Sequence, residues 1–468
     1  MTYRTINPAT GKVVKTYEDI SDAALSETME VAQACFESDW RQRSIAQRAA
    51  IVQTAATLMR KQSDHLAGLV TLEMGKLIAE AKGEVALSAD ILDYYAQRAE
   101  TFLTPQQIPG APNSTIETFP LGIILGVEPW NFPYYQLARV AGPQLMVGNV
   151  LVVKHASNVP QSALAFAQIF EEAGAPKGAY TNVFASVDQV GRLIGDPRVR
   201  GVTVTGSERA GAAVAERAGR ALKKSVMELG GSDPFIVLED APLEPTLANA
   251  IWGRMNNTGQ SCVASKRVIV IGKERGRQFL DRLKVGMASL RAGDPADPET
   301  TLGPVSSESA MTGLLNQIES AKAAGARVAT GGGRVNRPGF YVEATILTDI
   351  TENNPIYSQE LFGPVISFYV VESEEEAIKV ANATPFGLGG SVFTANVEHG
   401  KKLARRIESG MAFVNHPTWT APELPFGGIK NSGYGRELSE LGFAEFVNRK
   451  LIAVAAAGSP PPTVSQAG

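Results

Sequence analysis

The chain has 468 residues, of which 44% are hydrophobic and 20% charged, a composition that predicts a globular protein of two or three domains with a large core. A formal net charge of -4, without a dense run of Lys or Arg, excludes the usual signature of a nucleic-acid-binding protein. Two cysteines are too few for a disulfide framework. Residues 1–5 lack the apolar core of a signal peptide, and no apolar stretch of the sequence is long enough to span a bilayer. We therefore expect a cytoplasmic protein that binds neither nucleic acid nor membranes.

Residues 21–103 are predicted to form mainly amphipathic helices, because apolar side chains recur at three- and four-residue spacing. The pattern is clearest in Ala46–Met59 and Leu66–Ile78. Cys35 lies in the first helical stretch, and we interpret it as a small buried hydrophobic residue. After a connector rich in Pro and Gln, polar and apolar residues alternate along Ser114–Phe119, which predicts a half-exposed strand.

From residue 121 onward, short apolar strands alternate with helices. The expected strands are Leu121–Val127, Val150–Lys154, Thr181–Phe184, Val199–Thr205 and Ser225–Leu229, and the expected helices are Tyr134–Val147 and Pro160–Ala173. This alternation predicts a parallel, doubly wound sheet whose ligand lies at the carboxyl ends of the strands. A second strand-helix region begins beyond Gly231, with strands at Phe235–Leu238, Val268–Ile271 and Val365–Val371.

Three loops at predicted strand ends carry candidate ligand-binding residues. Asn131 can donate a side-chain N–H to an oxyanion, although an Asn before an aromatic residue and a Pro also suits a turn. Lys154 suits a cofactor ribose or phosphate, whereas an isolated Lys is often a solvated charge, and His155 is given no role. Gly206 and Gly211 bracket a loop before a helix, whose N-terminus can bind an anion. A plain strand-to-helix turn would look the same, and the fingerprint Gly-x-Gly-x-x-Gly is absent.

Cys262 is the candidate nucleophile, because it follows Asn-Asn-Thr-Gly-Gln-Ser, a stretch of Gly and small polar residues that is a poor setting for a core side chain. A thiolate in this loop could attack a carbonyl group and form a thioester. Glu228, in the segment Met-Glu-Leu-Gly-Gly, is the candidate base for cleaving that thioester with water. The alternative reading of Cys262, as an ordinary buried thiol, is outweighed by the two motifs together.

Taken together, these motifs resemble those of the aldehyde dehydrogenase superfamily, in the family's order from about Asn7 to about Phe446. The resemblance implies an α/β fold with a Rossmann-type cofactor domain, an α/β catalytic domain and a small β extension for oligomerisation, and hence a homodimer or homotetramer. The implied bounds are 1–113 and 127–229 for the cofactor domain, 230–430 for the catalytic domain, 114–126 and 431–457 for the extension, and 458–468 for a mobile tail.

The resemblance also implies residue roles in the oxidation of a small aldehyde. Cys262 would be the nucleophile, Glu228 the general base and Asn131 the oxyanion donor. The implied cofactor-binding residues are Trp130, Lys154, Ser157, Gly206, Ser207, Gly211, Leu229, Glu360 and Phe362, and no metal is implied. Among them Glu360 would bind the nicotinamide ribose, and Phe362 would pack near the ring.

Cofactor and substrate preferences follow from particular positions. NAD-preferring relatives often carry a Glu three residues after the Lys of this loop, where Ser157 stands here, so we predict that NADP is preferred and NAD accepted. Several segments resemble bacterial succinate-semialdehyde dehydrogenases, in which Arg139 would bind the far carboxylate and Thr420 would line the far wall. A second Arg of many such enzymes is replaced by Asn256, which weakens the prediction of the substrate but not that of the reaction.

Three alternatives remain open. The same chemistry could act on glutarate semialdehyde or a medium-chain aldehyde. The acyl group could instead be transferred to coenzyme A, although relatives that do so commonly lack the Glu at the position of Glu228. A non-catalytic protein with the same fold is disfavoured because Cys262, Glu228, Asn131 and Glu360 occur together.

Overall fold

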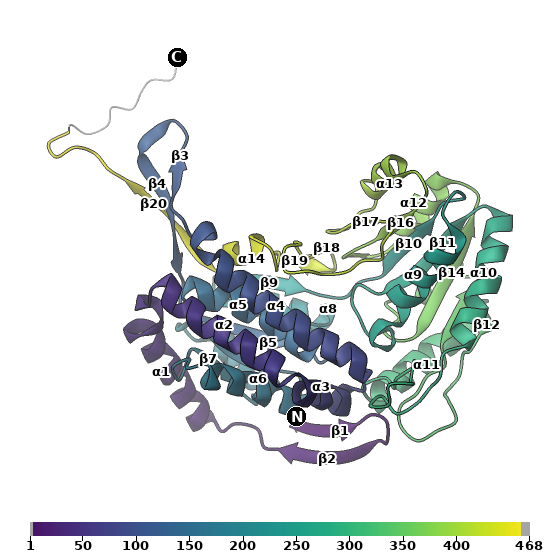
Figure 1. The fold of residues 1–468 in the computed structure, drawn as a ribbon, viewed down its shortest axis with the longest axis horizontal. Helices are drawn as coiled ribbons and strands as arrows, with labels where there is room; N and C mark the ends of the chain where they lie inside the picture. The colour runs from purple at the N-terminus through teal and green to yellow at the C-terminus, as the bar shows by residue number, and fades with distance from the viewer. Residues whose placement is uncertain (1–2, 460–468) are drawn as a thin grey trace.

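The computed structural model describes residues 3–459. It consists of two lobes, each built on its own β-sheet, and a three-stranded arm that projects from them (Figure 1). Residues 460–468, most of the predicted mobile tail, lie outside the described residues. No helix among the described residues is both long and apolar enough to cross a membrane.

The first lobe contains a six-stranded sheet in the order β19-β9-β8-β5-β6-β7. Its strands are β5 (Ile123–Glu128), β6 (Val150–His155), β7 (Tyr180–Asn182), β8 (Val199–Thr205), β9 (Lys224–Glu228) and β19 (Gly433–Tyr434). All neighbours are parallel except β19, which runs antiparallel to β9. Four helices connect the strands: α5 (Pro133–Val147), α6 (Pro160–Glu172), α7 (Val187–Gly195) and α8 (Glu208–Arg220). The predicted parallel, doubly wound sheet is therefore present, with boundaries shifted by one or two residues at most strand ends.

Helix α5 is buried along its whole length, because it lies between the sheet and the N-terminal helices. Those helices are α1 (Asp22–Ser38), α2 (Ile45–Lys61), α3 (Ser63–Met74) and α4 (Ile78–Phe102). The helical pattern predicted through Leu66–Ile78 is wrong at its end, since Gly75 adopts φ +80° and stops α3 at Met74. Cys35 lies on α1 with its side chain buried, as predicted.

The second lobe contains a seven-stranded sheet in the order β12-β13-β14-β11-β10-β16-β17. Its strands are β10 (Asp233–Val237), β11 (Ser265–Ile271), β12 (Arg327–Thr330), β13 (Thr345–Thr348), β14 (Val365–Val371), β16 (Ser391–Phe393) and β17 (Phe413–Val414). Successive side chains of β10 alternate between two apolar clusters, so both faces of this sheet are covered. The covering helices are α9 (Leu243–Met255), α10 (Lys273–Ala288), α11 (Glu308–Ala323), α12 (Glu374–Asn382) and α13 (Val397–Ala404).

The arm is a three-stranded antiparallel sheet that projects from the first lobe (Figure 1). It consists of β3 (Gln106–Ile108), β4 (Ala111–Pro120) and β20 (Val447–Ala453). The predicted extension, 114–126 and 431–457, contains residues of the arm and residues of the first lobe. Strand β5 already belongs to the six-stranded sheet from Ile123, and β19 within 431–457 pairs with β9.

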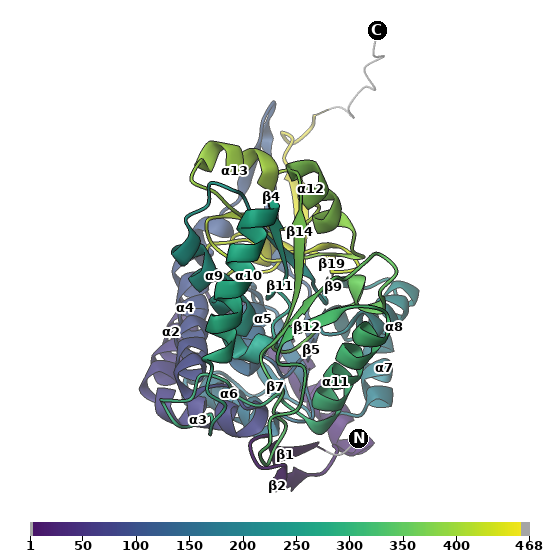
Figure 2. The same ribbon diagram turned by 90° about the vertical axis from the view of Figure 1, so that its right-hand side faces the viewer.

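An N-terminal hairpin of β1 (Tyr3–Asn7) and β2 (Lys12–Tyr17) lies beside α3, as both ribbon views show (Figures 1 and 2). Helices α3 and α6 pack against β1. The remaining short elements are η1 (Trp40–Gln42), η2 (Asn256–Gly259), η3 (Pro355–Tyr357), β15 (Phe386–Gly387), β18 (Ile429–Lys430) and α14 (Leu441–Ala444).

The turn at Gly75 gives a test of this architecture. A Cβ added to Gly75 would lie 2.6 Å from Cγ of Pro304, in a left-handed conformation that L side chains disfavour. We expect Gly75→Ala to lower the free energy of unfolding by about 1–3 kcal/mol and the melting temperature with it. Gly68→Ala is the matched control on α3, where a Cβ meets open space and should be neutral or slightly stabilising. Equal melting temperatures for the two variants would contradict the structure of this turn.

Candidate active site

Cys262 lies in the loop that connects α9 to β11, at the junction of the two lobes. The loop has an unusual backbone, because Asn257, Thr258 and Gly259 all adopt left-handed conformations with φ of 56°, 55° and 75°. Such conformations persist only where surrounding contacts hold them. Here the Asn257 amide donates to the carbonyl oxygens of Asn131 (2.8 Å) and Gln260 (3.0 Å).

Asn131, the predicted oxyanion donor, lies against this same loop. Its Nδ2 donates to the carbonyl oxygen of Gln260 at 3.1 Å, two residues before Cys262. Among the described residues this is the only acceptor for Nδ2, which leaves its second N–H available. The structure therefore brings Asn131 to the nucleophile loop.

Two buried cations, Lys266 and Arg254, contact both the Cys262 loop and the segment around Glu360. Lys266 Nζ donates to the carbonyl oxygens of Ser261 (2.7 Å) and Cys262 (2.8 Å), and it forms an ion pair with Glu360 Oε1 at 3.1 Å. Arg254 donates only to backbone carbonyl groups, those of Gly259, Leu361, Gly363 and Val365. The loop that bears Cys262 and the segment that bears Glu360 are therefore held as one unit.

Cys262 is a free, half-buried cysteine. Desolvation raises its pKa to about 12, and the cations of Lys266 and Arg139 oppose this rise. At neutral pH the thiol is thus protonated in this arrangement. A nucleophilic role requires that a base or a change in surroundings remove the proton.

Glu228 ends strand β9 and is 2% exposed. Neither of its carboxylate oxygens has a hydrogen-bond partner among the described residues. Burial raises its pKa well above the ordinary value, the carboxylate of Glu437 raises it further, and the guanidinium of Arg139 lowers it. A carboxyl group with a raised pKa is what a general base needs to accept a proton near neutral pH. Gly427 leaves room for it, because a Cβ there would lie 2.7 Å from Glu228 Oε1.

Arg139 is 1% exposed and already has several partners. Its Nε forms an ion pair with Glu437 Oε2 at 2.6 Å, and Nη2 donates to Thr205 Oγ1 at 3.1 Å. Its guanidinium also faces the ring of Tyr135, whose hydroxyl bonds with Thr420 Oγ1 at 2.8 Å. The two predicted substrate-binding residues, Arg139 and Thr420, thus both contact the hydroxyl group of Tyr135.

The predicted cofactor residues surround the carboxyl end of the six-stranded sheet. Ser207 caps α8, since its Oγ accepts from the Ala210 N–H at 3.3 Å. Gly211 permits α8 to approach Leu229, because a Cβ would lie 2.6 Å from a Leu229 methyl group. Gly206 donates its N–H to the carbonyl oxygen of Glu228, and a carboxylate oxygen of Glu360 accepts from the Gly231 N–H. Lys154 lies near the end of β6, and Ser157 lies two residues beyond that strand. Trp130 packs edge-on against the ring of Phe362.

This donor set suits a phosphorylated dinucleotide. The N-terminus of α8 presents the positive end of a helix dipole, Lys154 supplies an ammonium group, and Ser157 supplies a hydroxyl group where a carboxylate would repel a phosphate. Gly230 adds room at Glu360, because a Cβ there would lie 2.7 Å from Glu360 Oε2. The residues present therefore fit a nicotinamide cofactor.

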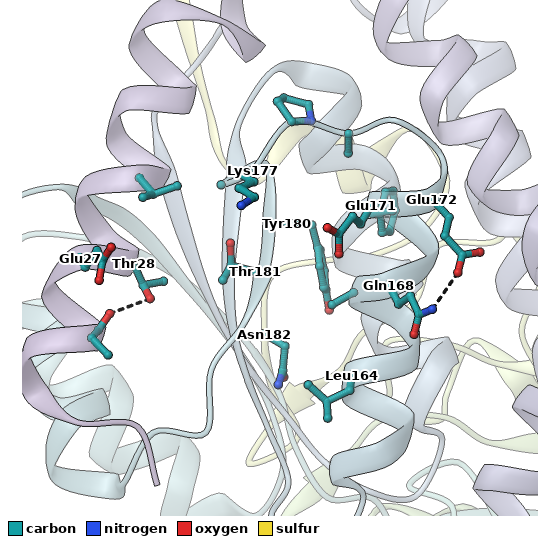
Figure 3. Close-up of a pocket in the computed structure, with 17 residues that line it drawn as sticks. Glu27, Thr28, Leu164, Gln168, Glu171, Glu172, Lys177, Tyr180, Thr181 and Asn182 are labelled. Atoms are coloured by element: carbon teal, nitrogen blue, oxygen red, sulfur yellow. Dashed lines mark hydrogen bonds between the residues drawn. The ribbon is translucent and has the colours of Figure 1, made fainter. Parts of the chain in front are cut away.

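Among the described residues, Cys262 lines neither of two sizeable cavities. One, of about 480 Å³, is lined by Trp130 and Ser157 among others and adjoins the predicted cofactor residues. The other, of about 890 Å³, lies between α1, α6 and β7 (Figure 3) and contains none of the predicted site residues. The larger cavity is therefore not the candidate active site.

Comparison with known proteins agrees with this geometry. The model of the aldehyde dehydrogenase family matches residues 1–452, and the chain belongs to this family. The chain is 49% identical to the succinate-semialdehyde dehydrogenase [NADP(+)] of Deinococcus radiodurans over 96% of this chain and 94% of that protein. It is 45% identical to the probable succinate-semialdehyde dehydrogenase [NADP(+)] of Synechocystis sp., over 97% of this chain and all of that protein. The crystal structure of succinic semialdehyde dehydrogenase from Streptococcus pyogenes with NADP+ superposes with a TM-score of 0.94 at 47% identity, over 97% of this chain and 99% of that one.

Sequence reasoning missed four residues that complete the site: Lys266, Arg254, Glu437 and Gln260. Their signal is weak, because isolated Lys, Arg, Glu and Gln residues are exposed in most proteins. Only Lys266 and Arg267, two basic residues directly before the apolar run Val268–Ile271 of β11, hint at buried partners.

Lys266 offers a test of the electrostatics around the thiol. We expect Lys266→Met to slow alkylation of Cys262 by iodoacetamide about tenfold at a fixed mildly alkaline pH, because loss of the cation raises the thiol pKa. Lys266→Arg keeps the charge and should retain most of the reactivity. Peptide mass spectrometry separates Cys262 from Cys35, which serves as an internal control. Unchanged alkylation of Cys262 in Lys266→Met would show that the ammonium does not act on the thiol.

Proposed function

We propose that the protein oxidises succinate semialdehyde to succinate, with NADP as preferred cofactor and NAD also accepted. The observation that carries this proposal is the convergence of the Cys262 loop, the Asn131 amide and the buried carboxyl of Glu228 at the junction of two lobes. The names of the relatives at 45–49% identity support the substrate and the cofactor.

In the proposed reaction the Cys262 thiol first releases its proton to solvent, the thiolate sulfur attacks the aldehyde carbon, and the carbonyl oxygen becomes an oxyanion. The free N–H of Asn131 donates to this oxyanion, which one such donor typically stabilises by ~3 kcal/mol. The bound nicotinamide supplies the hydride acceptor for this oxidation. Cys262 is then left as a thioester, and Glu228 removes a proton from the water that cleaves it. The products are the carboxylic acid and the free thiol.

The substrate proposal centres on Arg139. A guanidinium can bind a carboxylate through two hydrogen bonds, which would select a semialdehyde with a far carboxylate over an uncharged aldehyde. Glu437 already pairs with this cation at 2.6 Å, so a substrate carboxylate would share the guanidinium of Arg139 with Glu437. Glutarate semialdehyde, one carbon longer, is the alternative with the same anchor. Transfer to coenzyme A is disfavoured by the presence of Glu228.

We also propose the larger organisation that the family implies. The first lobe would bind the cofactor, the second lobe would carry the nucleophile, and the arm of β3, β4 and β20 would pair with a second copy in a homodimer or homotetramer. Leu451 and Val454, at 61% and 66% exposure on and just after β20, support this role for the arm, because a partner would cover them. We place the enzyme in the cytoplasm.

A panel of aldehydes assayed with NADP and NAD tests the function, and Cys262→Ala tests its mechanism. We expect this variant to lose oxidation entirely, since the only other cysteine, Cys35, is buried on α1. Cys35→Ala is the control and should retain nearly full activity. Oxidation by Cys262→Ala at a rate near that of the parent would refute the covalent mechanism.

Arg139 is tested by comparing two substrates. We expect Arg139→Ala to reduce kcat/KM for succinate semialdehyde by about 2–3 kcal/mol in transition-state binding. Butanal, which lacks the carboxylate, should be affected far less. Equal losses for both substrates would mean that Arg139 serves only to neutralise Glu437 and hold the fold.

A further inference from the structure

Glu80, on helix α4, holds the backbone of the Cys262 loop. Both of its carboxylate oxygens accept from the Asn257 N–H, each at 3.2 Å. Asn257 is the first of the three left-handed residues of this loop, and its side-chain amide donates to the carbonyl oxygens of Asn131 and Gln260. A left-handed backbone at a residue other than glycine persists only where contacts hold it, and Glu80 supplies such a contact from outside the loop.

Glu84 lies one helical turn further along α4 and holds the segment that follows Asn131. Its Oε1 accepts from the N–H groups of Tyr134 and Tyr135, at 2.8 and 3.2 Å. These N–H groups belong to the first turn of α5, whose N-cap residue, Phe132, provides no side-chain cap. Glu84 therefore caps α5 from a neighbouring helix, and α5 begins two residues after Asn131.

Lys76 joins the two carboxylates into one charged cluster, called here the α4 cluster. Lys76 is 1% exposed and forms an ion pair with Glu84. Burial lowers the pKa of Lys76, and the carboxylates of Glu84 and Glu80 both oppose this change. The ammonium also lies 3.6 Å from the ring centre of Phe132, the residue that follows Asn131. The cluster thus contacts the neighbourhood of the oxyanion donor and, through Glu80, the nucleophile loop.

We propose that the α4 cluster positions the Asn131 amide against the Cys262 loop. In the described part of the chain, the cluster forms no hydrogen bond or ion pair with Cys262 or with the Asn131 side chain. Its members are therefore positioning residues, which act through the Asn257 N–H and through the first turn of α5. Their effect on the reaction is large because an oxyanion donor is effective only when its N–H is already aimed at the developing charge. The inference rests on the proposed roles of Cys262 and Asn131.

Two reactions of Cys262 separate the position of the oxyanion donor from the reactivity of the thiol. In acylation by p-nitrophenyl acetate, the thiolate adds to the ester carbonyl carbon and the carbonyl oxygen becomes an oxyanion. The p-nitrophenolate then leaves, and the acetyl group remains on the sulfur. In alkylation by iodoacetamide, the sulfur displaces iodide and no oxyanion forms. Peptide mass spectrometry of the intact protein, treated without cofactor, follows both reactions.

We expect Glu80→Met to slow acylation of Cys262 about tenfold and to change alkylation by no more than about twofold. Methionine fills a similar volume but offers no oxygen to the Asn257 N–H. Glu80→Gln keeps an acceptor oxygen and should recover most of the acylation rate. Glu84→Met removes the acceptor for the first turn of α5 and should give the same selective loss, which tests the proposal even if Glu80→Met does not fold.

Glu100→Met is the matched control, because Glu100 is an exposed residue of the same helix, and it should leave both reactions unchanged. Asn131→Ala is the reference and should also slow acylation selectively. Combining it with Glu80→Met should slow acylation little further, since both changes act on the same donor. Equal slowing of acylation and alkylation in Glu80→Met, or independent losses in the double variant, would overturn the proposal. So would a wild type that is acylated at Cys262 no faster than at Cys35.

The two proposals can fail separately. If no aldehyde is oxidised while Glu80→Met still loses acylation selectively, the proposed reaction is wrong and the positioning role stands. If succinate semialdehyde is oxidised with NADP while Glu80→Met is acylated as fast as wild type, the positioning role is wrong and the reaction stands.

Discussion

The junction of the two lobes depends on one buried ammonium group, that of Lys266. Placing an ammonium away from water costs several kcal/mol, so it must be compensated nearby. Here the compensation comes from the Glu360 carboxylate and from two consecutive carbonyl groups, those of Ser261 and Cys262. A shift of the Cys262 loop away from Lys266 would therefore leave this cation with Glu360 as its remaining partner. Cys262 and Glu360 are held in place by contacts with the same ammonium group.

A second constraint is the balance between buried carboxyl groups and the guanidinium of Arg139, a residue of α5. Three buried carboxyl groups, those of Glu128, Glu228 and Glu437, lie near the guanidinium of Arg139, and the carboxylate of Glu437 raises the pKa of the other two. Desolvation is the largest cause of the raised pKa of each, because burial disfavours the charged form. In the proposed mechanism Glu228 must be deprotonated when it activates water. Burial therefore works against the form of Glu228 that this step needs, and the guanidinium of Arg139 favours that form.

Much of the fold and of the candidate site can be predicted from the sequence, whereas the rest depends on tertiary contacts. Strand and helix periodicity predicted both sheets, because local apolar patterns decide which face is buried. Periodicity missed the break at Gly75, where the helical pattern continues but a close approach to Pro304 demands a left-handed residue. The motifs predicted Cys262, Glu228 and Asn131. Lys266 and Glu437 could not be predicted, because their importance lies in partners far away along the chain, namely Glu360 and Arg139.

The central claim is that the reaction passes through an acyl group on Cys262 that Glu228 helps to release. Its most direct test is to mix Glu228→Gln protein with succinate semialdehyde and NADP, quench with acid, and map the modified peptide by mass spectrometry. The account predicts a succinyl group on the Cys262 peptide, in nearly stoichiometric amount, and none on the Cys35 peptide. Full turnover of Glu228→Gln with no acyl group on Cys262 would contradict it.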